Sequence, residues 1–197
     1  MALKRCIDVI GSAFALLLLS PILIPAALAV WLDSGRPILF RHRRVGLEFR
    51  KFDVLKFRTM RVETSGPAIT VAGDTRITRV GRFLRATKLD ELPQFWNVLV
   101  GDMSLVGPRP EVPEYVEMFR DRYQRILTVR PGITDIASIR FRDEEKLLAG
   151  AAEPLREYKQ SVLPLKLDLA DEYLSTRSLR LDCLILLKTF LAVFRTA

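Results

Sequence analysis

The feature that most constrains this chain is an uncharged run near its N-terminus. Val9 to Leu32 spans 24 residues without a charged side chain, directly after Lys4, Arg5 and Asp8. At about 1.5 Å per residue, a straight helix of that length can cross a bilayer core of roughly 30 Å. Length alone is therefore compatible with an ordinary transmembrane anchor.

Two features favour a bent, re-entrant helix over a simple span. Ser20-Pro21 lies near the middle of the run and Pro25 follows one turn later. A proline inside a helix removes a backbone hydrogen bond and causes a kink, and the serine hydroxyl can satisfy the carbonyl that the proline frees. Because basic residues flank both ends of the run, the positive-inside tendency does not select a translocated side. We therefore expect residues 1–35 to form a helix-break-helix that enters and leaves through the same leaflet.

A cleaved signal peptide is a further alternative, since Ala27-Leu28-Ala29 resembles a cleavage site. The mature chain would then lose its anchor while keeping a cysteine pattern typical of the cytosol, so we do not favour it. Cys6 and Cys183 lie far apart in apolar stretches, and the chain has one histidine. Neither a disulfide framework nor a zinc site is expected.

Positive charge is concentrated after the apolar run. The chain has a net charge of +8, and residues 36–88 contain 14 Lys and Arg against 4 Asp and Glu. Such a balance indicates an anionic partner: nucleic acid, an acidic bilayer face or a phosphorylated substrate. The sequence shows no recognition helix, RNP motif or zinc finger, and an N-terminal membrane segment argues against binding to nucleic acid. It also lacks a Walker-type loop, a nucleophile elbow and a dinucleotide fingerprint.

The rest of the chain predicts a mainly α fold with one small β-hairpin. Short β-prone runs at 37–40 and 52–57 are separated by a turn around 43–47, and 63–75 has the composition of a polar loop. Helical patterns cover residues 77–86, 92–100, 112–125, 143–150, 152–175 and 179–194. The last of these combines an apolar face with basic residues, as expected of a membrane-surface helix or a core helix. We expect 36–197 to form one catalytic domain ending in this interfacial helix.

Two adjacent acids, Asp90 and Glu91, stand beside the cations Arg85 and Lys88. Neighbouring helical residues point about 100° apart, so one carboxylate could attack a substrate while the other handles a proton or a metal. The alternative is a solvated helix N-terminus, where acids suit the helix dipole. A phosphate-bearing substrate would need the nearby cations, together with Mg²⁺ bridging its oxygens to acidic side chains.

Further arginines have two possible readings. Arg109 stands between two prolines in Gly107-Pro108-Arg109-Pro110, which fix the local backbone. The motif is either a ligand site prepared in advance or a stiff corner whose arginine pairs with a surface acid. Arg140 and Arg142 flank Phe141 and belong to either an exposed strand edge or a phosphate clamp.

Taken together, these stretches resemble the bacterial sugar transferase family, the monotopic phosphoglycosyl transferases. The order and number of the fragments carry the resemblance, which covers nearly the whole chain in the small form of the family. The matching fragments are Lys4-Arg5…Asp8, Ser20-Pro21, Arg44-Val45-Gly46, Lys56-Phe57-Arg58-Thr59-Met60, Leu89-Asp90-Glu91-Leu92-Pro93-Gln94, Asn97-Val98-Leu99, residues 101–110 and Arg130-Pro131-Gly132-Ile133-Thr134.

The resemblance implies transfer of a sugar-1-phosphate from a nucleotide diphosphate sugar to undecaprenyl phosphate, with Mg²⁺ as cofactor. It places the enzyme among membrane lipids on the cytoplasmic face of the bacterial inner membrane. There it would start assembly of a glycan, whether O-antigen, capsule, exopolysaccharide or glycoprotein. A homodimer stays open, as do two rival functions: a catalytically silent scaffold of a glycan-assembly complex, and a hydrolase that binds polyprenyl phosphate.

The resemblance also implies roles for individual residues. Asp90 would attack the β-phosphate, release a nucleoside monophosphate and contact the metal, while Glu91 would assist with the proton or the metal. The candidate substrate ligands are Lys56, Arg58, Arg85, Arg109 and Arg142. One stretch departs from the common pattern: after Pro131-Gly132-Ile133-Thr134 many relatives continue with Gly, an apolar residue, Ala-Gln-Val and Gly-Arg. Residues 135–142 of this chain read Asp-Ile-Ala-Ser-Ile-Arg-Phe-Arg.

Overall fold

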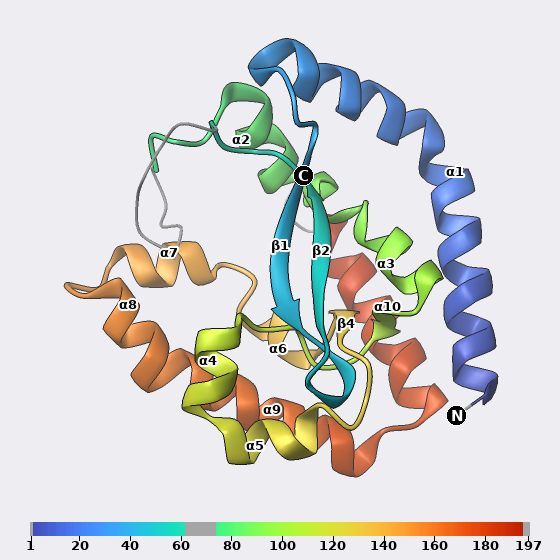
Figure 1. Cartoon of the computed structure of the whole chain (residues 1–197), viewed down its shortest axis with the longest axis vertical. Coiled ribbons are helices and arrows are strands. Elements are labelled where there is room, and N and C mark those ends of the chain that lie inside the picture. Colours follow the sequence, from blue (N-terminus) through green and yellow to red (C-terminus); the bar gives the residue numbers. More distant parts are fainter. Residues whose placement is uncertain (1, 62–73, 195–197) are drawn as a thin grey trace.

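The computed structural model describes residues 2–61 and 74–194. Most of these residues are helical, and the strands form two small two-stranded sheets (Figure 1). The predicted fold class, mainly α with a β-hairpin, is confirmed in these terms. The polar loop expected at 63–75 lies largely outside the described residues.

The N-terminal apolar run forms one helix, α1 (Ala2–Ser34), which bends along its length (Figure 1). Pro21 and Pro25 lie inside it and are the local cause expected for such a bend. The Ser20 hydroxyl donates to the carbonyl of Leu17 at 2.7 Å. That carbonyl lies four residues before Pro21 and lacks its usual helical hydrogen bond, because proline has no N–H to donate. The predicted bond from the serine hydroxyl to a freed carbonyl is therefore confirmed, whereas α1 is continuous through Ser20 and Pro21.

Most of α1 is exposed. Its buried residues are Asp8, Ser12, Ala26 and Val30, and large apolar side chains along it face outward. Within residues 2–61 and 74–194, α1 is the helix that is long and apolar enough to cross a membrane, judged by length and composition. An exposed apolar surface of this extent marks a site of interaction rather than a solvated face.

The start of α1 is held by charged contacts, which we call the entry contacts. Arg5 donates to the carbonyls of Val98 at 2.7 Å and Leu99 at 3.1 Å, at the end of helix α3 (Gln94–Val100). A cation there suits the negative end of the helix dipole. Buried Asp8 accepts from the Ser104 hydroxyl at 2.9 Å and from the Leu105 N–H at 3.1 Å.

The entry contacts extend to the other end of the chain. Lys4 pairs with Asp182 at 2.6 Å, and the Tyr173 hydroxyl donates to the same carboxylate at 2.8 Å. Asp182 belongs to helix α10 (Leu179–Phe194), whose bounds agree with the helix predicted from the sequence. The first and last helices are thus tied together by one ion pair.

The end of α1 is held at a second place, which we call the exit turn (Asp33–Gly35). The Asp33 carboxylate accepts from the Val80 N–H at 3.2 Å, near the start of helix α2 (Arg79–Ala86). Arg58 donates through Nη2 to the Ser34 carbonyl, to the Ser34 hydroxyl at 2.9 Å and to the Gly35 carbonyl at 2.9 Å. Both ends of the bent helix are therefore fixed to the rest of the domain by polar contacts.

The predicted hairpin consists of β1 (Leu39–Val45) and β2 (Lys51–Phe57), which pair in antiparallel register. The first strand is longer than expected, because the turn begins after Val45 rather than at Arg43 and contains a short 3₁₀ segment, η1 (Leu47–Phe49). The extra strand residues have partners that keep them extended. Arg43 lies across from Asp53, at 3.2 Å, and Arg44 pairs with Glu111 at 2.9 Å.

The middle of the chain differs from the prediction in two ways. The helix expected at 112–125 is broken at Phe119 into α4 (Pro113–Met118) and α5 (Arg120–Ile126). The segments at Gly107-Pro108 and Pro131-Gly132 also lie side by side: β3 (Ser104–Val106) runs parallel to β4 (Gly132–Thr134). Their backbones approach so closely that a Cβ on Gly107 or Gly132 would overlap the backbone of the other segment. Only glycine fits at such a contact.

Residues 136–176 pack around the apolar cluster with the most residues in the described part of the chain. These residues form α6 (Ile136–Arg140), α7 (Glu144–Ala149), α8 (Pro154–Glu157), the π-helical segment η3 (Tyr158–Val162) and α9 (Leu163–Thr176). The helix predicted over 152–175 is helical from residue 154, with the π segment inside it. Side chains from α4, α5 and α9, including Tyr115, Ile126 and Leu167, form the core there.

The entry contacts predict a stability effect at Asp8. Replacing Asp8 with alanine removes an acceptor that is 3% exposed, which leaves the Leu105 N–H without its partner and the Ser104 hydroxyl with only the Val106 carbonyl. We expect the free energy of unfolding to fall by about 2–3 kcal/mol, measured by denaturation of the purified protein in detergent. Asp8→Asn, which keeps one acceptor oxygen, should lose less. Asp121→Ala, at an exposed position on α5, is the matched control, and an equal loss in both alanine variants would contradict the prediction.

Candidate active site

The adjacent acids lie in a sharp turn between two helices. After α2, Lys88 adopts a left-handed backbone conformation (φ +59°), and a separate 3₁₀ turn, η2 (Leu89–Glu91), carries Asp90 and Glu91. The sequence placed the acids in the first turn of a helix at 92–100, and this is wrong in detail. Pro93 has no N–H to bond back to the acidic turn, so α3 begins only at Gln94.

The two carboxylates have different surroundings. Asp90 is 7% exposed, and its carboxylate has no hydrogen-bond partner within the described part of the chain. Glu91 is held by two cations: its Oε1 lies 2.7 Å from Lys56 Nζ and 2.6 Å from Arg109 Nη2. Arg109 Nη1 also donates to Oε2 at 3.4 Å. One acid is thus locked in place, and the other is buried but unbonded.

Lys56 reaches Glu91 because β2 is fixed to α3. Asn97, a buried polar residue of α3, accepts from the Leu55 N–H at 2.9 Å and donates to the Asp53 carbonyl at 2.8 Å. These bonds satisfy two backbone groups on one edge of β2, just before Lys56. The sequence analysis assigned no role to Asn97, and a buried asparagine in an apolar helix is the signal that could have found it.

Arg109 reaches Glu91 because Asp135 and the Ile133 carbonyl fix the position of the Gly107–Pro110 segment. The Arg109 N–H donates to Asp135 at 3.1 Å, and Nη1 donates to the Ile133 carbonyl at 3.3 Å. The same Asp135 carboxylate caps α6 by accepting from the Ser138 N–H at 2.6 Å. Asp135, noted above only as a departure from the family pattern, therefore supports the arginine corner.

The electrostatic environment separates the two acids. Burial, together with the charge of Glu91, raises the pKa of Asp90 to about 6, against the opposing effect of Lys56, Lys88 and Arg85. Burial also disfavours ionisation of Glu91, but Arg109 and Lys56 outweigh it and hold the pKa of Glu91 well below its ordinary value. At neutral pH, Glu91 is firmly ionised, and Asp90 is an ionised carboxylate close to its titration point. A buried, perturbed carboxylate beside fixed cations is typical of functional sites.

The structure brings together only some of the predicted ligands. Lys56 and Arg109 contact Glu91, and Arg85 lies near enough to Asp90 to affect its pKa. Arg58 instead bonds the exit turn of α1. Arg142 lies in the turn after α6 and is partly buried, and its assignment as a substrate ligand stays a prediction.

A divalent cation has few ligands in the described chain. No cluster of three or more His, Cys, Asp or Glu side chains suited to a metal occurs in residues 2–61 and 74–194. Asp90 offers an unbonded carboxylate, and Glu91 offers oxygens already shared with Lys56 and Arg109. Mg²⁺ is commonly bound by one or two carboxylates plus substrate phosphates. The residues therefore fit a metal that arrives with a phosphorylated substrate and is held by Asp90.

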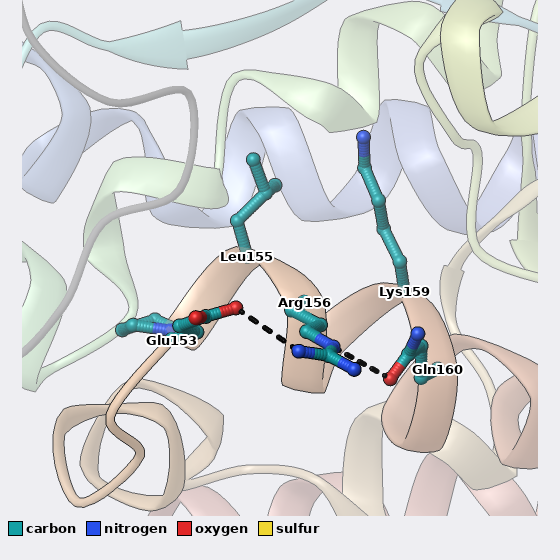
Figure 2. A pocket seen from close by; sticks show the side chains of 6 residues that line it. Glu153, Leu155, Arg156, Lys159 and Gln160 are labelled. Carbon is teal, nitrogen blue, oxygen red and sulfur yellow. Dashed lines mark hydrogen bonds and ion pairs between the residues drawn. The ribbon is translucent and has the colours of Figure 1, made fainter.

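A separate hollow of about 430 Å³ lies on α8 and η3, lined by residues 153–156, 159 and 160. In Figure 2, Arg156 lies between Glu153 and Gln160, to which it is linked at 3.6 and 3.2 Å. Lys159 pairs with Glu114 on α4. Neither Asp90 nor Glu91 lines this hollow, so it forms no part of the acidic site.

Comparison with known proteins gives a consistent result. A family model described as bacterial sugar transferase matches residues 1–196. A UDP-glucose:undecaprenyl-phosphate glucose-1-phosphate transferase from Caulobacter vibrioides is 41% identical over 98% of this chain and 70% of its own length. The Escherichia coli K12 protein of the same name is 46% identical over 70% of this chain and 31% of its own length. A UDP-N-acetylgalactosamine-undecaprenyl-phosphate N-acetylgalactosaminephosphotransferase from Aeromonas hydrophila is 38% identical over 95% and 42%.

The two acids are expected to affect stability in opposite directions. The folded-state pKa of Asp90 is raised from 3.8 to about 6, so its ionised form costs stability above that pH, and the cost disappears as the pH falls toward 3.8. Asp90→Asn should therefore stabilise the fold, on the order of 3 kcal/mol at pH 8 and about half of that at pH 5.

Glu91→Gln should instead destabilise the fold by about 3 kcal/mol at pH 8, since it leaves Lys56 and Arg109 without their shared anion. The pKa of Glu91 is lowered on folding, so its contribution is present above the ordinary glutamate pKa and is lost only in strong acid. Denaturant unfolding of both variants at pH 5 and 8 measures these effects. An Asp90→Asn protein less stable than wild type at pH 8 would show that the ionised Asp90 carboxylate does not destabilise the fold.

Proposed function

The chain belongs to the bacterial sugar transferase family, and we propose that this enzyme moves a sugar-1-phosphate from a uridine diphosphate sugar to undecaprenyl phosphate. The names of the relatives supply the substrate classes: a UDP-hexose donor and an undecaprenyl-phosphate acceptor. The observation that carries the proposal is the buried, unbonded Asp90 beside the cation-locked Glu91. The donor sugar differs among the relatives, so we propose only its class.

In the first step, an Asp90 carboxylate oxygen attacks the β-phosphorus of the donor. The bond from that phosphorus to the oxygen bridging it to the α-phosphate breaks, and uridine monophosphate leaves with the bonding pair. The phosphosugar is then joined to Asp90 as an acyl phosphate. A carboxylate with a pKa of about 6 is ionised at neutral pH, and the absence of hydrogen bonds to it within the described residues avoids their loss on attack.

In the second step, a phosphate oxygen of undecaprenyl phosphate attacks the same phosphorus. The bond to Asp90 breaks, the carboxylate is regenerated and the product is an undecaprenyl diphosphate sugar. Two successive in-line displacements restore the original configuration at phosphorus. No proton has to be transferred to either leaving group at neutral pH, because both leave as anions.

The roles of the neighbouring residues follow from their contacts. Glu91, ionised and bonded twice, anchors Lys56 and Arg109 rather than serving as a proton carrier. The remaining N–H groups of these cations can bind the donor phosphates. Mg²⁺ held by Asp90 and the donor would supply charge neutralisation at the phosphate oxygens. Arg85 adds positive potential at Asp90.

The bent α1 suits the lipid acceptor. We propose that α1 enters and leaves one leaflet as a re-entrant hairpin on the cytoplasmic face of the inner membrane, with Ser20-Pro21 at its break. The entry contacts and the exit turn both tie α1 to the domain that carries Asp90. A domain held in this way can reach an acceptor phosphate at the headgroups. The product would then start the assembly of a glycan, a role that fits one relative named as an exopolysaccharide production protein.

The central experiment is release of uridine monophosphate from UDP-sugars by the purified enzyme. Asp90→Asn should reduce release at least about a thousandfold, because an amide does not replace a carboxylate nucleophile. Asp121→Asn, the same chemical change at an exposed site, should leave release unchanged. Equal release by wild type and Asp90→Asn would refute the mechanism, and no release by either protein would favour a scaffold. Release without a lipid-linked sugar product would favour a hydrolase.

Topology has its own test. Single cysteines introduced at Ala2 and Arg36, in a background with Cys6→Ser and Cys183→Ser, should react with a membrane-impermeant maleimide from the same side. The two native cysteines are exposed and so must be removed first. Labelling in intact and lysed spheroplasts distinguishes the sides, and reaction from opposite sides would establish a transmembrane span.

A further inference from the structure

Arg58 links the end of α1 to the strand that carries Lys56. We call its contacts with Ser34 and Gly35 the joint. It follows Lys56 by two residues and is 5% exposed. Its Nη2 bonds three oxygens of Ser34 and Gly35, while Nε and Nη1 have no hydrogen-bond partner among the residues that the structure describes. A buried guanidinium devoted to one backbone turn is unusual, because burying charge is costly. Its contacts fix where α1 ends relative to β2.

The residue between Lys56 and Arg58 strengthens this joint. Phe57, 5% exposed, packs in one cluster with Ala26 and Val30 of α1 and Leu84 of α2. Leu89, next to Asp90, packs against the same cluster. Together with the bond from the Val80 N–H to Asp33, these contacts connect the end of α1 to both elements that deliver the site. The exit turn thus moves with Lys56 and Asp90 as one body.

The two proposed substrates differ in how they reach the site at Lys56 and Asp90. The nucleotide sugar is water-soluble and can approach the site at any height above the membrane. The acceptor phosphate is held at the headgroups by its hydrocarbon chain, so its distance from Asp90 depends on how deeply α1 sets the domain. A misplacement of about 1 Å can reduce a rate roughly a hundredfold.

We propose that Arg58 is a positioning residue that sets the depth of Asp90 relative to the bilayer and thereby governs transfer to the lipid acceptor. The inference rests on the proposed function and assigns Arg58 to its second step rather than to binding of the donor. Lysine cannot reproduce the contacts of Arg58, since its side chain is shorter and its ammonium does not reach the position of Nη2. Arg58→Lys keeps the charge and loosens the joint. Ser34→Ala removes one acceptor and leaves the arginine in place.

The first measurement separates the two steps in the full-length enzyme reconstituted in lipid nanodiscs. We expect Arg58→Lys to release uridine monophosphate in a single turnover within about threefold of wild type, and to transfer sugar to undecaprenyl phosphate at least about tenfold more slowly. With a short-chain polyprenyl phosphate in detergent, where depth is not fixed, transfer should recover to within about threefold of wild type. Ser34→Ala should show the same pattern more weakly.

The second measurement reports depth directly. The chain has two tryptophans, and Trp96 on α3 is 52% exposed. In a Trp31→Phe background, quenching of Trp96 by lipids brominated at different chain positions gives its depth. Arg58→Lys should change the ratio of quenching by shallow and deep bromines. Arg122→Lys, which weakens an arginine fork to Asp168 and Asp171 away from the joint, should not.

The outcomes are distinguishable. Equal losses in monophosphate release and lipid transfer, or lost transfer with unchanged Trp96 quenching, would overturn the role of Arg58. Both results leave the proposed function intact. A wild-type enzyme that releases no monophosphate from any UDP-sugar would overturn the proposed function itself.

Discussion

The site depends on one shared anion. Glu91 accepts from Lys56 on β2 and from Arg109 at the proline corner, so three segments far apart in sequence meet at a single carboxylate. Two half-buried cations are not stable side by side without such a counter-charge. Their attraction to Glu91 places the hairpin, the acidic turn and the corner at fixed distances. Asp90 then lies in positive potential without bonding to either cation.

This arrangement divides the acidic pair into a support, Glu91, and the proposed nucleophile, Asp90. Glu91 is ionised and has both oxygens engaged, whereas Asp90 is buried and has a pKa raised to about 6. In the proposed mechanism, the same burial that makes the ionised form of Asp90 costly to the fold leaves its carboxylate ready to attack the donor. The support extends outward through Asn97 behind the lysine and Asp135 behind the arginine. Positioning of this kind is what charged-group transfer requires of a protein.

The sequence predicted what local patterns determine. Ser20 and Pro21 indicated the bent helix and its hydroxyl compensation, and the apolar spacing after Leu179 defined the last helix. The pairing of the two glycine corners was missed, since two strands of three residues carry no periodicity and depend on a backbone approach 25 residues apart. Likewise, no local pattern indicates that Arg58 bonds Ser34, and the family motif alone assigned it to the substrate.

The ion pair between Lys4 and Asp182 joins residues that are 178 positions apart in the sequence. The start of α1 is therefore secured only once synthesis has reached α10. During that interval, only an apolar environment can shelter its exposed side chains. Under the proposed topology, α1 enters lipid before the catalytic domain is complete, so the domain folds at the membrane surface.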